Sequence, residues 1–405
     1  MPFVPLSTPA DAFEGFWISN LPDNDISLAV TNGRPTLLLP HLTRFSMPDY
    51  FHLQFSEPAF KRYNLIALDL PGWPGTKAPL LREQGDKYDE WVAAAIIGDF
   101  CLTMNLKDVH FLGVSVFSGK ILPRLAALFP SIPKSISLSC VMADTPPSAD
   151  LSDGLRANID RWIHATTRQE LDEIIQGEVY MWFYDNNPVD TKMLDDFTND
   201  WRAQRIHTNA LIGAMVYFTT GMATEEAELV RCPILVAQGD ISHLFSPEDA
   251  RQLVAHYPNA QSNVHILSGG PPVTSVTPEF APTLHRLVIS HIEHSMLASP
   301  TTTTFPKPLP HTSSETAIST DTRREKGMRE AMKTYISVAP EWLKHELETR
   351  DPLSVLSFSH RSPEQVKELH ERWYDRWLEM ENEERPEEKR VEVDKSAAYT
   401  SKPNS

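Results

Sequence analysis

From the N-terminus to about residue 298, short apolar runs alternate with longer segments of helical periodicity. This alternation is typical of a mostly parallel sheet covered by helices, because parallel strands need a crossover connection between them. The predicted strands are Thr36–Leu39, Asn64–Asp69, Val109–Val114, Ser135–Cys140, Pro233–Gln238 and Asn263–Leu267. The predicted helices include Tyr88–Met104, Lys120–Leu128 and Pro247–His256. The sequence therefore predicts an α/β fold.

One predicted strand runs straight into a Gly-x-Ser turn and then into a helix, over residues 109–128. A serine at such a tight bend presents its hydroxyl at the helix N-terminus, where backbone N–H groups can stabilise an oxyanion. Ser115 is the candidate nucleophile, and Val116 and Phe117 follow it as candidate oxyanion or pocket residues. The motif usually has glycine at the position of Phe117, because the helix crosses close to the strand. A plain strand-to-helix connection is the alternative interpretation.

The alternation of strands and helices stops between residues 146 and 229, where only amphipathic helical patterns rich in aromatic residues occur. An insertion of this kind can form a lid over a pocket, although aromatic stripes at helical spacing also serve ordinary packing. We therefore predict one domain over residues 1–298, with a helical lid at about 146–229.

The rest of the chain has a different composition. Residues 299–325 are rich in Pro, Ser and Thr and are predicted to form a linker. Residues 326–405 are predicted to form a helical extension with a charged tail. Within it, an apolar stripe comprises Val366, Leu369, Trp373, Trp377 and Met380, at spacings of three and four. Such a stripe needs a cover, either the main domain or, as the alternative, a second copy or partner helix.

Charge and cysteine content narrow the partners and the compartment. The chain has 405 residues and a formal net charge of −17, which argues against nucleic acid or an anionic membrane surface as a partner. No apolar run approaches membrane-spanning length, and Cys101, Cys140 and Cys232 have no metal-type spacing. We expect a cytoplasmic protein with buried thiols. No metal cluster, phosphate-binding glycine loop or dinucleotide fingerprint occurs, so no cofactor is predicted.

Three segments in order resemble the α/β-hydrolase superfamily. Leu65–Gly75 resembles the strand and turn that precede the nucleophile elbow, residues 109–130 resemble the elbow and its helix, and Pro233–Asp240 resembles the strand that delivers the triad acid. The resemblance covers roughly residues 30–298. It implies a mostly parallel α/β-hydrolase sheet, with His41 and Leu42 opening the oxyanion loop, where the family usually carries His-Gly.

The chain departs from the family pattern at both remaining triad positions. The acid position that the resemblance implies holds Ser242, while Asp240 stands where a carboxylate stabilises a turn. The turn that should carry the triad histidine has none, because no histidine occurs between His265 and His285. A serine hydroxyl without an adjacent base is a poor nucleophile, so these residues do not predict the catalytic triad of a standard serine hydrolase.

Two arrangements remain open for the chemistry. In the first, His243 reaches inward as the base and Asp144 orients it. In the second, the pocket supports proton transfer, lyase or cyclase chemistry that needs no acyl-enzyme, with Ser115 or His41 as a donor.

Two functions follow from these arrangements. The first is an enzyme of hydrolase, lyase or cyclase type that acts on a small, largely apolar organic substrate. An ester, a thioester or a related carbonyl compound fits this description, as does a role in specialised metabolism. The alternative is a pseudo-hydrolase that serves as a binding or interaction protein, with the C-terminal helices as the contact surface for a partner or a second copy.

Overall fold

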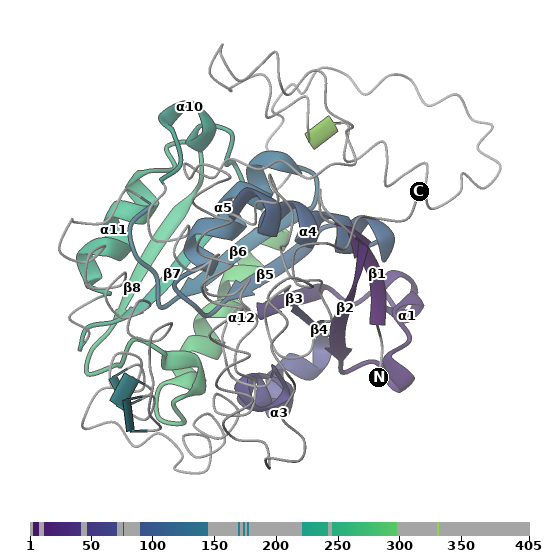
Figure 1. Ribbon diagram of the computed structural model, residues 1–405, viewed down its shortest axis with the longest axis horizontal. Coiled ribbons are helices and arrows are strands. Elements are labelled where there is room, and N and C mark those ends of the chain that lie inside the picture. The colour runs from purple at the N-terminus through teal and green to yellow at the C-terminus, as the bar shows by residue number, and fades with distance from the viewer. Residues whose placement is uncertain are drawn as a thin grey trace, which may run out of the picture.

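The computed structural model describes residues 3–7, 12–41, 47–70, 76, 90–144, 169–170, 173–174, 176–177, 221–241, 245–297 and 330–331. Most of the predicted lid, the whole linker and nearly all of the C-terminal extension lie outside these residues, so their structure stays a prediction. The described part is an eight-stranded sheet with helices on both faces (Figure 1).

The sheet has the order β1-β2-β4-β3-β5-β6-β7-β8. Its strands are β1 (Phe3–Ser7), β2 (Ala12–Ser19), β3 (Thr36–His41), β4 (Asn64–Asp69), β5 (Val109–Gly113), β6 (Pro133–Ser139), β7 (Ile234–Gly239) and β8 (Ser262–Leu267). The six strands from β4 to β8 in this order are parallel, and β1 and β2 add an antiparallel edge. The predicted mostly parallel α/β sheet is therefore confirmed.

Helices on both faces explain why the central strands are apolar along their whole length. Every residue of β3, β4 and β5 is buried, as expected for parallel strands covered on both sides. The long helices are α4 (Glu90–Thr103), α5 (Ser118–Leu128), α11 (Pro247–Ala255) and α12 (Ala281–Leu297). Helices α4, α5 and α11 cover one face and α12 covers the other (Figure 1).

Short helical elements complete the described structure. They are α1 (Ser27–Thr31), α2 (Met47–Tyr50), α3 (His52–Ser56) and α10 (Thr224–Ala227), with 3-10 turns η1 (Pro22–Asn24), η2 (Pro58–Arg62) and η3 (Thr274–Val276). Elements α2, α3 and η3 lie near the carboxyl ends of the strands and supply polar groups there.

The end of β7 passes very close to the turn that follows β8. A Cβ atom added at Gly239 would lie 2.2 Å from the carbonyl oxygen of Pro271 and 2.4 Å from that of Gly270. Only glycine allows this approach, which brings the turn after β8 against the carboxyl edge of the sheet.

We predict that Gly239→Ala destabilises the fold by about 1–3 kcal/mol, because its methyl group must displace two backbone carbonyls. Urea unfolding followed by circular dichroism measures the effect. Gly177→Ala is the matched control, since no heavy atom lies within 4 Å of the Cβ position there. Equal stability of the two variants would show that the turn moves freely.

Strand β5 and helix α12 each carry a buried histidine, His110 and His291. His110 Nδ1 lies 2.8 Å from the hydroxyl of Ser135 on β6. The pKa of His110 is lowered to about 4, mainly by burial and in smaller part by the nearby basic groups His291 and Lys134. Burial also lowers the pKa of His291 on α12. Both imidazoles are therefore neutral in the folded protein near pH 7.

The neutral state of His110 predicts acid sensitivity. The unfolded chain binds a proton at this histidine near pH 6.5, whereas the folded chain resists protonation down to about pH 4. The free energy of unfolding should therefore be fully present above the unfolded pKa and fall by about 3 kcal/mol as the pH drops between these values. His110→Asn should show a shallower loss in urea titrations from pH 7 to 4.5. His265→Asn, on the exposed face of β8, should follow the wild type.

Candidate active site at the carboxyl edge of the sheet

The chain reverses its direction of travel across the sheet between β3 and β5. From β3 it moves to β4 on one side, and from β5 onward it adds strands on the other side. Ligands of open α/β sheets bind outside the carboxyl ends of the strands at such a switch point. His41 ends β3, Asp69 ends β4 and Ser115 follows β5, so the switch point brings these three residues to one edge.

Ser115 lies in the predicted strand–turn–helix connection. Strand β5 ends at Gly113 and α5 begins at Ser118, whose hydroxyl lies 3.3 Å from that of Ser115. Ser115 is 2% exposed. A nucleophile elbow holds its serine in a strained turn, but Ser115 is not among the non-glycine residues with positive φ. The connection therefore has the order of an elbow without the backbone strain.

The close approach of helix and strand occurs at two glycines on either side of Phe117. A Cβ atom at Gly113 would lie 2.4 Å from Cβ of Ser118, and one at Gly119 would lie 3.1 Å from the side chain of Val141. Phe117 itself is buried at the start of α5. The motif usually relies on a glycine at the position of Phe117 to let the helix pass close to the strand. Here Gly113 and Gly119 allow this close approach instead.

The backbone N–H of Val116, the predicted oxyanion donor, faces a thiol. Burial raises the pKa of Cys140 well above its ordinary value, and the N–H of Val116 lowers it in part. Cys140 also has a φ of 58°, an unusual conformation for a residue with a side chain. The end of β6 is thus held in a strained turn beside the residue that follows Ser115.

A buried histidine–carboxylate pair occupies the ends of β3 and β4. His41 and Asp69 are register partners in the parallel ladder, and Nδ1 of His41 lies 2.6 Å from Oδ1 of Asp69. Their exposures are 0% and 1%. A carboxylate only accepts hydrogen bonds, so Nδ1 carries the proton, and the orientation of the imidazole is fixed.

Tyr50 connects this pair to the Ser115 turn. Its ring centroid lies 5.7 Å from that of His41, and its hydroxyl donates a 2.6 Å hydrogen bond to the carbonyl of Val114. Burial raises the pKa of the Tyr50 hydroxyl far above its usual range, and Cys140 raises it further. The phenol therefore stays protonated and acts as a donor next to Ser115.

The turn after β8, where the family carries its histidine, presents hydroxyl groups instead. Thr274 Oγ1 lies 2.7 Å from the hydroxyl of Ser139 on β6. The adjacent Ser275 is buried, accepts a 2.9 Å hydrogen bond at its carbonyl from Gln54, and contacts Tyr50 through its side chain. These contacts tie the turn to the carboxyl edge without an imidazole.

Four residues considered for the site from the sequence either lie outside the described residues or stabilise a turn. Leu42, Ser242 and His243 are outside the described residues, so the proposed base His243 stays a prediction. Asp240 accepts a 2.7 Å hydrogen bond from the backbone N–H of Gly269. The predicted turn-stabilising role of Asp240 is confirmed.

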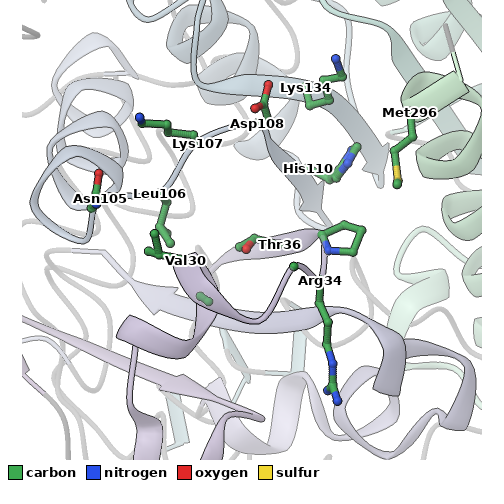
Figure 2. Close-up of a pocket in the computed structure, with 13 residues that line it drawn as sticks. Val30, Arg34, Thr36, Asn105, Leu106, Lys107, Asp108, His110, Lys134 and Met296 are labelled. Carbon is green, nitrogen blue, oxygen red and sulfur yellow. The ribbon is translucent and has the colours of Figure 1, made fainter. Parts of the chain in front are cut away.

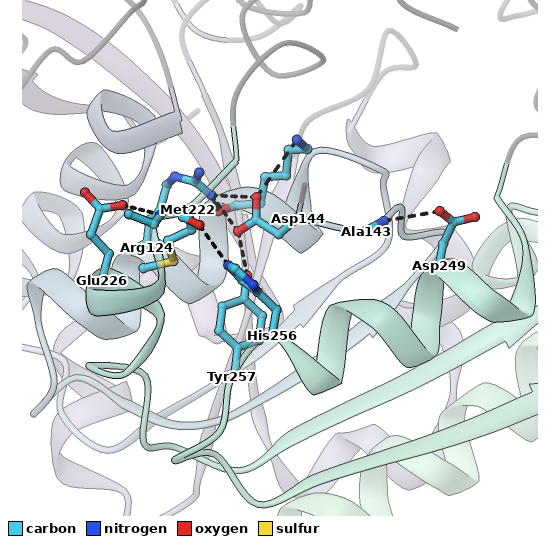
Figure 3. A network of polar contacts seen from close by, with 10 residues as sticks. Arg124, Ala143, Asp144, Met222, Glu226, Asp249, His256 and Tyr257 are labelled. Atoms are coloured by element: carbon cyan, nitrogen blue, oxygen red, sulfur yellow. Dashed lines mark hydrogen bonds and ion pairs between the residues drawn. The ribbon is translucent and has the colours of Figure 1, made fainter. Parts of the chain in front are cut away.

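Asp144 is the centre of a buried ionic network (Figure 3). Its carboxylate lies 3.1 Å from Nη1 of Arg124 and 3.9 Å from Nζ of Lys120, both on α5. It also accepts a 2.7 Å hydrogen bond from the hydroxyl of Tyr257, after α11. Arg124 stacks over Trp91 of α4 at 5.4 Å from the ring centroid.

These partners give Asp144 a role that the sequence did not predict. All the charged members are buried, and Figure 3 shows Arg124, Asp144 and Tyr257 pointing toward one another. Burial lowers the pKa of Arg124, but Asp144 and Glu90 more than compensate, so its pKa is raised. The network fastens the end of β6 to α5 and α11. Orientation of His243 by Asp144 stays a prediction. In that arrangement His243 would share the carboxylate with Arg124, Lys120 and Tyr257.

We predict that Asp144→Asn destabilises the protein by about 3–5 kcal/mol, because it removes the ion-pair partner of buried Arg124 and Lys120. Tyr257→Phe removes one hydrogen bond to a charged group and should cost less, about 1.5–3 kcal/mol. Glu248→Gln, which breaks an exposed pair with Arg251, should cost less than about 1 kcal/mol. Thermal and urea unfolding check this order, and a mild Asp144→Asn effect would contradict the structural role.

Sequence reasoning missed Asp69, Tyr50, Cys140 and Ser275 at this edge. A signal for Asp69 was present, since Asp69 ends one predicted strand and His41 lies two residues beyond the end of another, and the carboxyl ends of parallel strands meet at one edge of a sheet. Tyr50 lies in a four-residue helix that has no clear sequence pattern. No group of three or more potential metal ligands occurs among the described residues, and none of their helices has the length and apolarity to cross a membrane.

Comparison with known proteins identifies the fold. No sequence-family profile and no curated protein matches the chain. Solved structures do match. A thermophilic esterase from Thermogutta terrifontis has a TM-score of 0.54 and 16% identity, over 72% of this chain and 99% of its own. A bromoperoxidase from Bacillus anthracis has a TM-score of 0.55 and 13% identity, over 72% and 100%.

An esterase from Exiguobacterium antarcticum is similar to the same extent, with a TM-score of 0.55 and 15% identity over 72% of this chain and 98% of its own. The chain therefore has the α/β-hydrolase fold, as the resemblance of its three segments implied. At these identities the likeness establishes the fold alone. The chemistry must be argued from the residues at the carboxyl edge.

Proposed function

We propose that this protein is an enzyme that acts on a small, largely apolar organic substrate by proton transfer at the carboxyl edge of the sheet. The observation that carries the proposal is the 2.6 Å contact between His41 Nδ1 and Asp69 Oδ1, fully buried at the switch point. A histidine held in this way keeps one tautomer, in which Nε2 is the nitrogen that can take up a proton.

The proposed roles follow from the positions of the groups. His41 takes the proton, Asp69 stabilises the imidazolium that forms, and the hydroxyl of Ser115 is the candidate donor to a developing negative charge. Tyr50 positions the Ser115 turn, because its hydroxyl donates to the carbonyl of Val114. Ester, thioester and related carbonyl compounds have acidic C–H groups next to a carbonyl and suit such a base. Proton transfer needs no acyl-enzyme, which agrees with the absence of a histidine in the turn after β8.

A binding protein that has lost its chemistry is the second candidate. It is favoured by the unstrained backbone and low exposure of Ser115. Under this interpretation the His41–Asp69 pair only holds β3 against β4. The two candidates differ in whether removal of the imidazole affects turnover or only stability.

The test uses 5-nitrobenzisoxazole, a small aromatic compound whose ring opens when a base removes one proton. We expect saturable turnover by the wild type, and a loss of about 10²–10⁴-fold in His41→Ala, the usual contribution of a positioned base. Asp69→Asn should also lower the rate, because it weakens the orientation of His41. His243→Ala should leave it unchanged, and Ser115→Ala should reduce it less than His41→Ala does.

Circular dichroism and thermal unfolding establish that each variant is folded. An unchanged rate in folded His41→Ala would contradict the proposed mechanism. Loss of the rate in His243→Ala would support His243 as the base. Activated p-nitrophenyl esters complete the test, since a burst of nitrophenol that depends on Ser115 would demonstrate an acyl-enzyme. Absence of turnover on both substrates would favour the binding protein.

A further inference from the structure

A hollow lies at the opposite, amino-terminal edge of the sheet, where β3, β5 and β6 begin. Its volume is about 510 Å³, within the range of ligand pockets. It is lined by the segment that leads into β3, the turn before β5 and the last turn of α12 (Figure 2). No residue of the candidate active site lines it, so the hollow is a separate site.

Exposed apolar side chains gather at this hollow. Val30 and Met296 line it and are 47% and 52% exposed, and Leu297, next in the chain, is 84% exposed. Only one other large apolar side chain among the described residues is exposed, Ile241, which lies after β7 and does not line the hollow. A cluster of exposed apolar groups on an otherwise polar surface marks a place where another segment binds.

The mouth of the hollow is basic although the chain is acidic. Arg34, Lys107 and Lys134 line it, with Asp108 as its single carboxylate, in a chain of net charge −17. Figure 2 shows the amines of Lys107 and Lys134 directed away from the centre, where Thr36 lies. The interior is therefore mainly apolar and the rim carries the cations. Such a hollow fits apolar side chains with acidic neighbours.

We propose that this hollow binds residues 362–395 of the chain's own C-terminal extension. The apolar stripe from Val366 to Met380 would enter the hollow, and its acidic neighbours would face the basic rim. Residues 362–395 contain twelve acidic and seven basic residues, so their charge complements Arg34, Lys107 and Lys134. Trp373 and Trp377 are the large apolar groups that gain most from leaving water.

The course of the chain supports its own tail as the occupant. Helix α12 ends at Leu297, one residue after Met296, so the extension starts at the edge of the hollow. Ala331 is 3% exposed and belongs to the buried core cluster, which shows that the chain returns to the domain after the linker. A tethered segment binds at a high effective concentration, so modest contacts suffice to hold it.

Photocrosslinking in the full-length protein tests the proposal. The variant Val30→p-benzoylphenylalanine places a crosslinker at the hollow, and Ile241→p-benzoylphenylalanine is the matched control at an exposed apolar position elsewhere. Mass spectrometry of the monomer band should identify a crosslink from position 30, but not from position 241, to a peptide within residues 362–395.

Two further changes separate the proposed contacts. Trp373→Ala with Trp377→Ala should lower the yield at position 30 by about tenfold or more, since each large buried side chain stabilises the docked state. Lys107→Glu with Lys134→Glu should lower it by about threefold, as expected for exposed charge pairs. A crosslink that joins two chains would overturn the proposal in favour of a dimer contact. Equal yields at positions 30 and 241, or a product outside residues 362–395, would also overturn it.

Discussion

The reversal of strand order between β3 and β5 places every group of the candidate active site. Because β3 lies between β4 and β5, its terminal His41 has the end of β4 on one side and the Ser115 turn on the other. The same parallel ladder that pairs His41 with Asp69 also buries both, so neither can satisfy its polar atoms with water. Their mutual contact is the arrangement that offsets the cost of burial, and it leaves an oriented imidazole at the switch point.

Buried charge serves two different purposes in this protein. The network of Asp144 joins β6, α5 and α11 through partners that are all buried, an arrangement that is costly to break and little suited to proton transfer. The His41–Asp69 pair is smaller and joins one imidazole to one carboxylate at the ends of β3 and β4. This contrast favours a stabilising role for Asp144 and leaves the proposed chemistry to His41.

The central sheet could be predicted from the sequence because its signals are local. Asn64–Asp69 was predicted with the bounds of β4, and the ends of the other parallel strands lie within two residues of the predicted ends. Strands β1 and β2 were missed, since Pro5 and Gly15 are residues that normally argue against a strand, although proline is tolerated at a sheet edge. The site was only partly predictable, because contacts such as that of Tyr257 with Asp144 join residues 113 positions apart.

The two edges of the sheet differ in the side chains that they present to a ligand. At the carboxyl edge His41, Asp69 and Tyr50 are buried and hydrogen-bonded, so a ligand there must displace or use an existing hydrogen-bond network. At the amino edge the apolar groups Val30, Met296 and Leu297 remain in water, so a ligand there gains free energy simply by covering them. Helix α12 runs along the sheet with its C-terminus at the hollow, and η3, just before this helix, contributes Ser275 beside Tyr50. A segment docked at the amino edge would thus contact the C-terminal end of α12, whereas η3 lies at the other end of this helix. The carboxyl edge would stay open to substrate.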